Sequence, residues 1–541
     1  MESSNETATK PEYFGPGQPA TPEPNPVIKD NAPFFLGLSL AYGVCFAIAF
    51  FKNFIGIAYP AITAVTFWAC IVFLKKYGIP WRRPNWWYIA SALLLGISTA
   101  LTANGFVVFF NTVGILLLLS VFMVRQVYND RGWNLGQYIC NLMFLYLCMV
   151  PEVASPFIHL AGYLKKHRKT EQKNKNAKYI LIGIFIGLPM LFAVVWLLSS
   201  ADQIFSKLVG SIFWNLWSQV IFSPNIFLAF FLVVLGFFGI YCFLSALTLN
   251  NMPEWKQGKQ KKNPLTAITF LSMVTAVYVI FCTIQLVFLF TGGKLLPKEY
   301  TYAEYARQGF FQLLFVCLFN FALVMLCLTV FQQNKLLKTL LLVFSGCTYI
   351  MIASSTFRMA LYIEAYHLSF LRVLVLWFLA MLAVLLAGVI INIVKGEFGL
   401  FRYCMAVATV FYLVFSFGRP DALVASYNLA HQGDGISYWD IAYLANLSMD
   451  AAPALSKCRF GHSHSGEAKD YYKSQGYVEN VSGDFYNSGG VRLYVEGCKR
   501  CRLDRRFQEI LDETGNMDLR TFHVSKYRAR AAAENYFEGQ E

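Results

Sequence analysis

Three cysteines and two histidines in the last quarter of the chain have the residue types of a metal site. Cys458 is followed closely by His462 and His464, and Cys498 and Cys501 form a Cys-x-x-Cys pair. Thiolate and imidazole ligands in this combination bind Zn²⁺ tetrahedrally. The Cys-x-x-Cys pair is equally suited to a disulfide, which an exported location favours. Zinc, a disulfide and neither of the two stay open as alternatives. The zinc signal is moderate because the spacing of the first half matches no standard zinc module.

A carboxylate within an apolar stretch is the second candidate. Glu152 follows Pro151 at the centre of the apolar segment from Leu135 to Leu164. An intramembrane carboxylate is costly unless it is paired, protonated or in contact with water. Broken helices that carry such residues line ion and substrate paths in transporters. The alternative is that Glu152 lies in a solvated turn at the membrane surface.

A third group of polar residues flanks two connections between apolar segments. Its members are Glu304, Arg307, Arg358, Tyr362, Glu364 and Arg372. Arg358 and Tyr362 are four residues apart, so they share one face of a helix. The group predicts a polar pocket, and the alternative is that long side chains at helix ends reach toward water. Asn320, near the middle of a span, is better suited to an interhelical hydrogen bond than to ligand binding.

Motifs of enzymes are absent from the sequence. His159, His167 and His367 are isolated from one another along the chain, and no P-loop, nucleophile elbow or zincin motif is present. We therefore assign no catalytic residue, and the sequence favours a protein that is not an enzyme.

The elements that must position these residues are membrane helices. Hydrophobic residues make up 57% of the chain and charged residues only 14%, which is typical of a multi-pass membrane protein. We predict three parts: a Pro-rich, disordered cytoplasmic lead over residues 1–32, a multi-span membrane domain over 33–418, and an extracytoplasmic soluble tail over 419–541. The fold class is all-α, with about 11 transmembrane helices.

Charge decides how the broken segment around Glu152 is interpreted. If this segment re-enters and returns, the connections on one side of the membrane hold 23 Lys and Arg residues and those on the other hold 7. If it crosses once, the better division is only 16 to 14. The positive-inside rule favours the first arrangement, with a cytoplasmic N-terminus and an exported tail. Residues 165–178 then anchor the cytoplasmic side, and residues 202–220 form an amphipathic helix in the outer interface.

The net charge of +14 does not indicate nucleic-acid binding. From Arg419 onward the chain has 15 Lys and Arg residues against 17 Asp and Glu residues, so the basic excess lies between the spans. Membrane insertion explains basic residues there. The predicted partners are the lipid bilayer and a second membrane protein.

The tail is predicted to form a small, mainly helical unit held against the outer face. Its first part contains an apolar helical stripe with Pro453 at the end, and Ile510 and Leu511 indicate another helix. The stripe consists of Trp439, Ile441, Leu444, Leu447 and Leu455.

Several motifs resemble one protein family. They are Glu304–Phe311, Arg358–Tyr366, Arg419-Pro-Asp-Ala-Leu, the stretch from Trp439 through Asp450 to Leu455, and Phe522-His-Val-Ser-Lys-Tyr-Arg-Ala. Together they resemble an uncharacterised family of bacterial, mostly Firmicutes, multi-pass membrane proteins, catalogued as a domain of unknown function. The Cys/His segment between residues 456 and 501 departs from that pattern. The resemblance implies a bacterial cell membrane and no particular activity.

The leading functional interpretation is a non-enzymatic sensory or interaction component that works at the outer face. A permease for a small solute or ion, using the re-entrant segment around Glu152, is the alternative. A membrane-embedded enzyme comes third.

Overall fold

The computed structural model describes most of the chain in long stretches. These are residues 26–53, 55–82, 85–128, 135–167, 224–249, 262–290, 310–396, 398–461, 498–515 and 520–539, together with single residues and residue pairs between them. Within these residues, ten helices are long and apolar enough to cross a membrane, and the segment Leu135–Lys166 around Glu152 is one of them. An eleventh apolar helix, Trp86–Leu101, is shorter. The fold class is the predicted one, an all-α multi-pass membrane protein. The predicted elements at 178–200 and 202–220 lie largely outside the described residues.

The chain divides into two compact units. Unit 1 consists of Met1–Gly43, Phe73–Ile79 and Met143–Glu254, and unit 2 consists of Val44–Val72, Pro80–Leu142 and Trp255–Glu541. Several helices run from one unit into the other along the chain.

Unit 1 contains the helices around Glu152. They are α1 (Pro26–Asp30), α7 (Ser155–His167), α10 (Pro224–Thr248) and the short 3₁₀ helix η2 (Pro151–Ala154), with parts of α2 (Ala32–Phe50), α3 (Ala58–Tyr77) and α6 (Leu135–Cys148). Residues 26–30 of the predicted lead form the helical turn α1, in which Ile28 is buried and Asp30 forms an ion pair with Lys166 at 2.8 Å.

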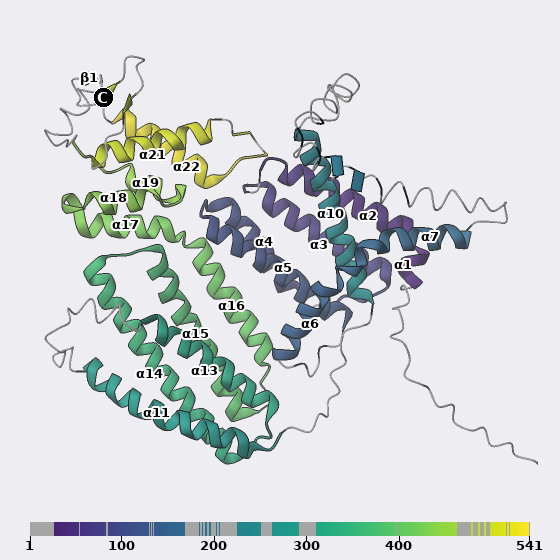
Figure 1. The fold of residues 1–541 in the computed structure, drawn as a ribbon, viewed down its shortest axis with the longest axis horizontal. Coiled ribbons are helices and arrows are strands. Elements are labelled where there is room, and N and C mark those ends of the chain that lie inside the picture. The colour runs from purple at the N-terminus through teal and green to yellow at the C-terminus, as the bar shows by residue number, and fades with distance from the viewer. Residues whose placement is uncertain are drawn as a thin grey trace, which may run out of the picture. The chain divides into compact units, whose positions relative to one another are not determined.

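Unit 2 contains most of the remaining spans. They are α4 (Trp86–Leu101), α5 (Gly105–Val127), α11 (Pro264–Phe290), α13 (Phe310–Val330), α14 (Lys335–Tyr366), α15 (Phe370–Lys395) and α16 (Leu400–Phe417). Helices α4 and α5 lie side by side, and α11, α13, α14 and α15 pack into a bundle that α16 borders (Figure 1). Close approach of α15 and α16 depends on Gly388, because a Cβ atom there would lie 2.1 Å from the ring of Tyr403. Small residues permit such packing between membrane helices.

The part of the tail that the structure describes contains five helices, all within unit 2. They are α17 (Pro420–Gln432), α18 (Tyr438–Ala445), α19 (Ala452–Leu455), α21 (Lys499–Thr514) and α22 (Val524–Glu538), with the short 3₁₀ turns η3 (Gly433–Gly435) and η4 (Met449–Ala451). A small antiparallel sheet has the order β1 (Val478–Glu479), β2 (Phe485–Tyr486), β3 (Arg492–Leu493). The tail is thus mainly helical.

The apolar stripe predicted in the tail is present with two corrections. Ile441, Leu444 and Leu455 are buried in the tail core, as expected for a packed stripe. Trp439 is not part of it and is 79% exposed, because it lies on the opposite side of the short helix α18. Pro453 does not end a helix. It occupies the first turn of α19, where its missing N–H has no helical partner to lose.

Candidate functional site

Glu152 lies where the long apolar segment is interrupted. Helix α6 ends at Cys148, and residues 151–154 form a 3₁₀ turn before α7 begins. Pro151 cannot donate a backbone hydrogen bond, which breaks the α-helical ladder at this point. Backbone hydrogen bonds here therefore join residues three apart instead of four. Met149 N–H donates to the Tyr146 carbonyl oxygen, and Val153 N–H donates to that of Val150. The interruption turns a carboxylate toward the interior of unit 1.

The carboxylate of Glu152 is buried and receives two hydroxyl donors. Glu152 is only 7% exposed. Ser245 Oγ, on α10, donates to Glu152 Oε2 at 2.5 Å, and Ser155 Oγ donates to the same oxygen. Among the described residues, no Lys, Arg or His forms an ion pair with Glu152. A carboxylate inside a membrane segment is costly unless it is paired, protonated or in contact with water, so such residues are candidates for ion paths.

A second polar pair lies one helical turn from Ser155 on α7 and one helical turn from Ser245 on α10. His159 Nδ1, on α7, and Tyr241 OH, on α10, are 2.8 Å apart, and both residues are buried. Tyr241 and Ser245 also line a pocket in unit 1, together with Ser39 of α2. Polar groups therefore continue from Glu152 along α10 within otherwise apolar helices.

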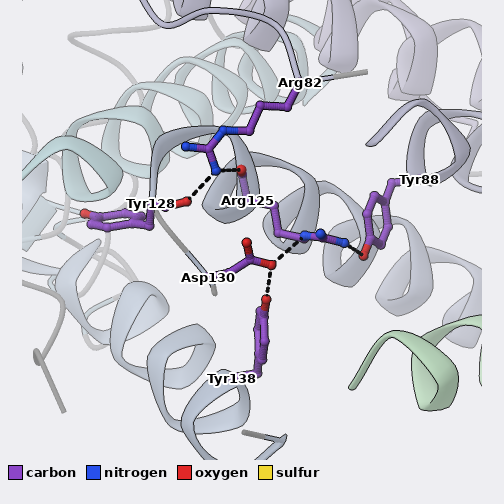
Figure 2. Close-up of polar contacts among 6 residues, drawn as sticks. All are labelled: Arg82, Tyr88, Arg125, Tyr128, Asp130 and Tyr138. Atoms are coloured by element: carbon purple, nitrogen blue, oxygen red, sulfur yellow. Dashed lines mark hydrogen bonds and ion pairs between the residues drawn. The ribbon is translucent and has the colours of Figure 1, made fainter. Parts of the chain in front are cut away.

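A buried charge cluster in unit 2 holds the end of α5 (Figure 2). Arg125 Nε lies 2.8 Å from Asp130 Oδ2, and both side chains are only 8% exposed. Arg125 also donates to Tyr88 OH on α4 at 2.8 Å, and Tyr138 OH on α6 donates to Asp130. Arg82 donates to the carbonyl oxygens of Arg125 and Tyr128, which the end of α5 leaves without helical partners.

A third polar network joins the tail to the turn between α4 and α5. Asp450 in η4 accepts from Thr102 Oγ1 and from Ser525 Oγ, both at 2.5 Å. Asp421 in α17 accepts from Asn104 Nδ2 at 2.7 Å. Burial raises the pKa of Asp450, and the nearby charge of Asp421 raises it further. The tail is therefore held on this turn by buried polar contacts.

His523 completes this network at the start of α22. Its Nε2 lies 3.2 Å from the carbonyl oxygen of Thr99, and its Nδ1 accepts from the Lys526 backbone N–H at 3.3 Å. Only the neutral ring with its proton on Nε2 fits both contacts. Burial lowers the pKa of His523 to about 4, with a further contribution from Lys526.

Two other turns between spans also contact the tail. After α2, Asn53 donates to the Arg520 carbonyl oxygen at 3.1 Å, and Ile57 N–H donates to that of Phe522 at 3.0 Å. Before α15, Leu368 N–H donates to Asn428 Oδ1 at 2.9 Å. Together with the α4–α5 turn, these contacts define one end of the unit 2 helices, which we call the tail side. The opposite end is the far side.

The predicted pocket of charged residues is described only in part. Glu304 and Arg307 lie outside the described residues. Arg358 is buried and donates to Gln285 Oε1 on α11 at 3.0 Å. Arg372 lies over the Tyr362 ring, 4.2 Å from its centroid, while Glu364 is exposed. The structure thus brings Tyr362 and Arg372 together, and the full pocket stays a prediction.

The other predicted site residues are distributed as follows. Asn320 is buried, donates to Thr348 Oγ1 at 3.1 Å and accepts from Tyr278 OH at 2.9 Å, so it connects α11, α13 and α14. His462 and His464 lie outside the described residues. Cys498 Sγ accepts from the Cys501 N–H at 3.4 Å, at the start of α21. The zinc and disulfide alternatives stay predictions.

Sequence reasoning missed two of these clusters. Arg125 follows a long apolar run and has the pattern of an ordinary basic residue at a span end. Its pairing with Asp130 carries no spacing signal. Asp421, Asp450 and His523 do lie within the motifs that suggested a family, but nothing in those motifs indicates that they meet at the α4–α5 turn.

These observations define the class of protein: an integral, multi-pass membrane protein with a helical tail packed on its spans. The family model named "Domain of unknown function (DUF4153)" matches residues 89–458. The chain therefore belongs to this family. The matched part begins in α4 and ends at Cys458, so the closing Phe522-His motif lies beyond it. No curated protein and no solved structure matches the chain.

Proposed function

We propose that this protein is an ion permease that conducts protons and that Glu152 is the group in its path that binds them. The observation that carries the proposal is the burial of Glu152 at a helix break, with two serine hydroxyls on one carboxylate oxygen. Ionisable residues inside membrane segments are rare and are associated with ion and proton paths. His159 and Tyr241 extend the polar groups one turn beyond the two serines that donate to Glu152.

The parity of membrane crossings supports a returning segment around Glu152. Helix α5 begins on the tail side, since Asn104 contacts Asp421, and so it ends on the far side. Helix α14 ends on the tail side and so begins on the far side. Lys262 also lies on the far side, because it pairs with Phe331 shortly before α14.

The chain between residues 128 and 261 therefore starts and finishes on the far side, so it crosses the membrane an even number of times. It contains three long apolar stretches, at 135–167, 178–200 and 224–248. One of the three must return to the side where it began. The stretch interrupted by Pro151 and the 3₁₀ turn is the best suited, because a break allows an apolar segment to change direction. The proposed count is then eleven crossings and one returning segment.

Basic residues support the proposed orientation. Among the described residues, the far side of unit 2 carries Arg82, Arg125, Lys262, Lys335, Lys338, Lys395 and Arg402, whereas the tail side of the spans carries Lys52, Arg358, Arg372 and Arg419. By the positive-inside rule the far side is cytoplasmic, which leaves the tail outside. Glu152 then lies in a segment that enters the membrane from the cytoplasmic side and returns to that side.

Proton flux tests the permease proposal. Purified protein in liposomes, driven by a potassium gradient with valinomycin, should acidify the lumen faster than empty liposomes, as measured with a trapped pH dye. The Glu152→Gln variant keeps the hydrogen-bonding shape but cannot ionise, so its rate should fall to that of empty liposomes. Glu364→Gln, an exposed carboxylate, is the matched control. Equal rates for Glu152→Gln and the unchanged protein, or no flux from the unchanged protein, would count against the permease.

A sensory or interaction component is the second candidate. It is favoured by the tail, which contacts three separate turns between spans through buried polar groups. A change in any of these spans would reach the tail through rigid contacts, as a receiver of signals across the membrane requires.

A further inference from the structure

Helix α18 of the tail lies at the level where a spanning helix begins. Tyr443 OH accepts from the backbone N–H of Phe370, the first residue of α15, at 3.0 Å. Trp439 precedes Tyr443 by four residues and therefore lies on the same face of α18. Its side chain is 79% exposed, and that of Tyr443 is 38% exposed. A large aromatic side chain thus projects from the tail close to the membrane boundary.

Helix α17 has an exposed apolar residue at the same boundary. It begins three residues after α16 ends, and Tyr427 packs against the hydrophobic core of the spans. Leu423 precedes Tyr427 by one helical turn and is 50% exposed. Leu371, in the first turn of α15, is also 50% exposed. Exposed apolar residues of the tail and of the first turn of α15 therefore both occur near this boundary.

We propose that Leu423, Trp439 and Tyr443 form an interfacial anchor that sits in the headgroup layer of the bilayer. Trp and Tyr favour this layer because their rings are apolar while their polar atoms remain hydrated. The occupant of this surface is phospholipid, since Tyr443 contacts the first residue of α15, a helix long and apolar enough to cross the bilayer. The anchor holds the tail along the membrane surface, independently of the polar contacts made by Asp450 and His523.

Lipid quenching of Trp439 fluorescence tests the anchor. The full-length protein is placed in nanodiscs that contain phospholipid with a spin label near the headgroup or near the end of the acyl chain. The spectrum of Trp439 is obtained as the difference between the unchanged protein and the Trp439→Phe variant. We expect strong quenching by the shallow label and weak quenching by the deep label. Trp86, which is 65% exposed at the start of α4, gives a reference difference spectrum through Trp86→Phe.

Quenching of the Trp439 signal by aqueous iodide with no effect of either lipid label would overturn the proposal. Resistance to iodide and to both lipid labels would also overturn it, because another protein surface would then cover Trp439. Circular dichroism of Trp439→Phe should match the unchanged protein, since the side chain lies outside the tail core.

Discussion

Replacing Arg125 with Met should destabilise the protein by about 3–5 kcal/mol, the usual cost of removing one partner from a buried ion pair. The substitution leaves Asp130 buried without its 2.8 Å ion pair and Tyr88 without its donor. Tyr138 would remain the neighbour of an uncompensated carboxylate. Because the cluster connects α4, α5 and the start of α6, these elements should loosen together. Denaturation in mixed detergent micelles, followed by circular dichroism, measures the loss.

Two variants separate the charge effect from the loss of side-chain volume. Arg402→Met removes an exposed arginine on the same side of unit 2 and should have little effect. The double variant Arg125→Met with Asp130→Asn removes both charges and should recover most of the stability. A double variant as unstable as Arg125→Met alone would contradict the ion-pair explanation.

Acidification should release the tail from the α4–α5 turn through His523. The folded-state pKa of His523 is about 4, below its ordinary value of 6.5, because the ring is buried. A lowered histidine pKa means that the unfolded state binds the proton more tightly, so stability is complete above pH 6.5 and falls as the pH decreases toward 4. Each tenfold difference in proton affinity is worth about 1.4 kcal/mol, so the total is roughly 3 kcal/mol.

The raised pKa of Asp450 acts in the opposite direction. Its folded form holds a proton more tightly than the unfolded form, so protonation of Asp450 stabilises the tail as the pH falls. The contribution of His523 to the stability of the tail is therefore isolated by comparing the unchanged protein with His523→Asn at each pH. The protection factors of the α22 amides, which are exchange rates corrected for their intrinsic pH dependence, should fall between pH 7 and pH 5 in the unchanged protein. In His523→Asn they should be lower at pH 7 and should not fall further on acidification.

His431→Asn is the matched control, since His431 is exposed at the end of α17. It should keep the pH dependence of the unchanged protein. If His523→Asn retained the same pH dependence as well, another group would be responsible for the release.

The sequence predicted the class of fold because long apolar segments in water-free surroundings can only be helices or closed barrels. It also singled out Glu152, since a carboxylate beside proline in an apolar run is visible without a structure. The Arg125–Asp130 pair and the contacts of Asp421 and Asp450 were not predictable in this way. Their partners lie on other helices. In a sequence, a polar residue just beyond a span gives the same pattern whether its side chain is solvated or contacts a buried partner. Trp439 was misassigned because α18 is too short for its periodicity to distinguish the buried face.

Reporter fusions test most directly the claim on which the account depends, that the segment 135–167 returns to the side where it began. Green fluorescent protein and alkaline phosphatase are each fused after Trp133, Lys175, Lys262 and Leu455. We predict fluorescence without phosphatase activity at Trp133, Lys175 and Lys262, and phosphatase activity without fluorescence at Leu455. Opposite results for Trp133 and Lys175 would show that the segment crosses the membrane and would contradict the account.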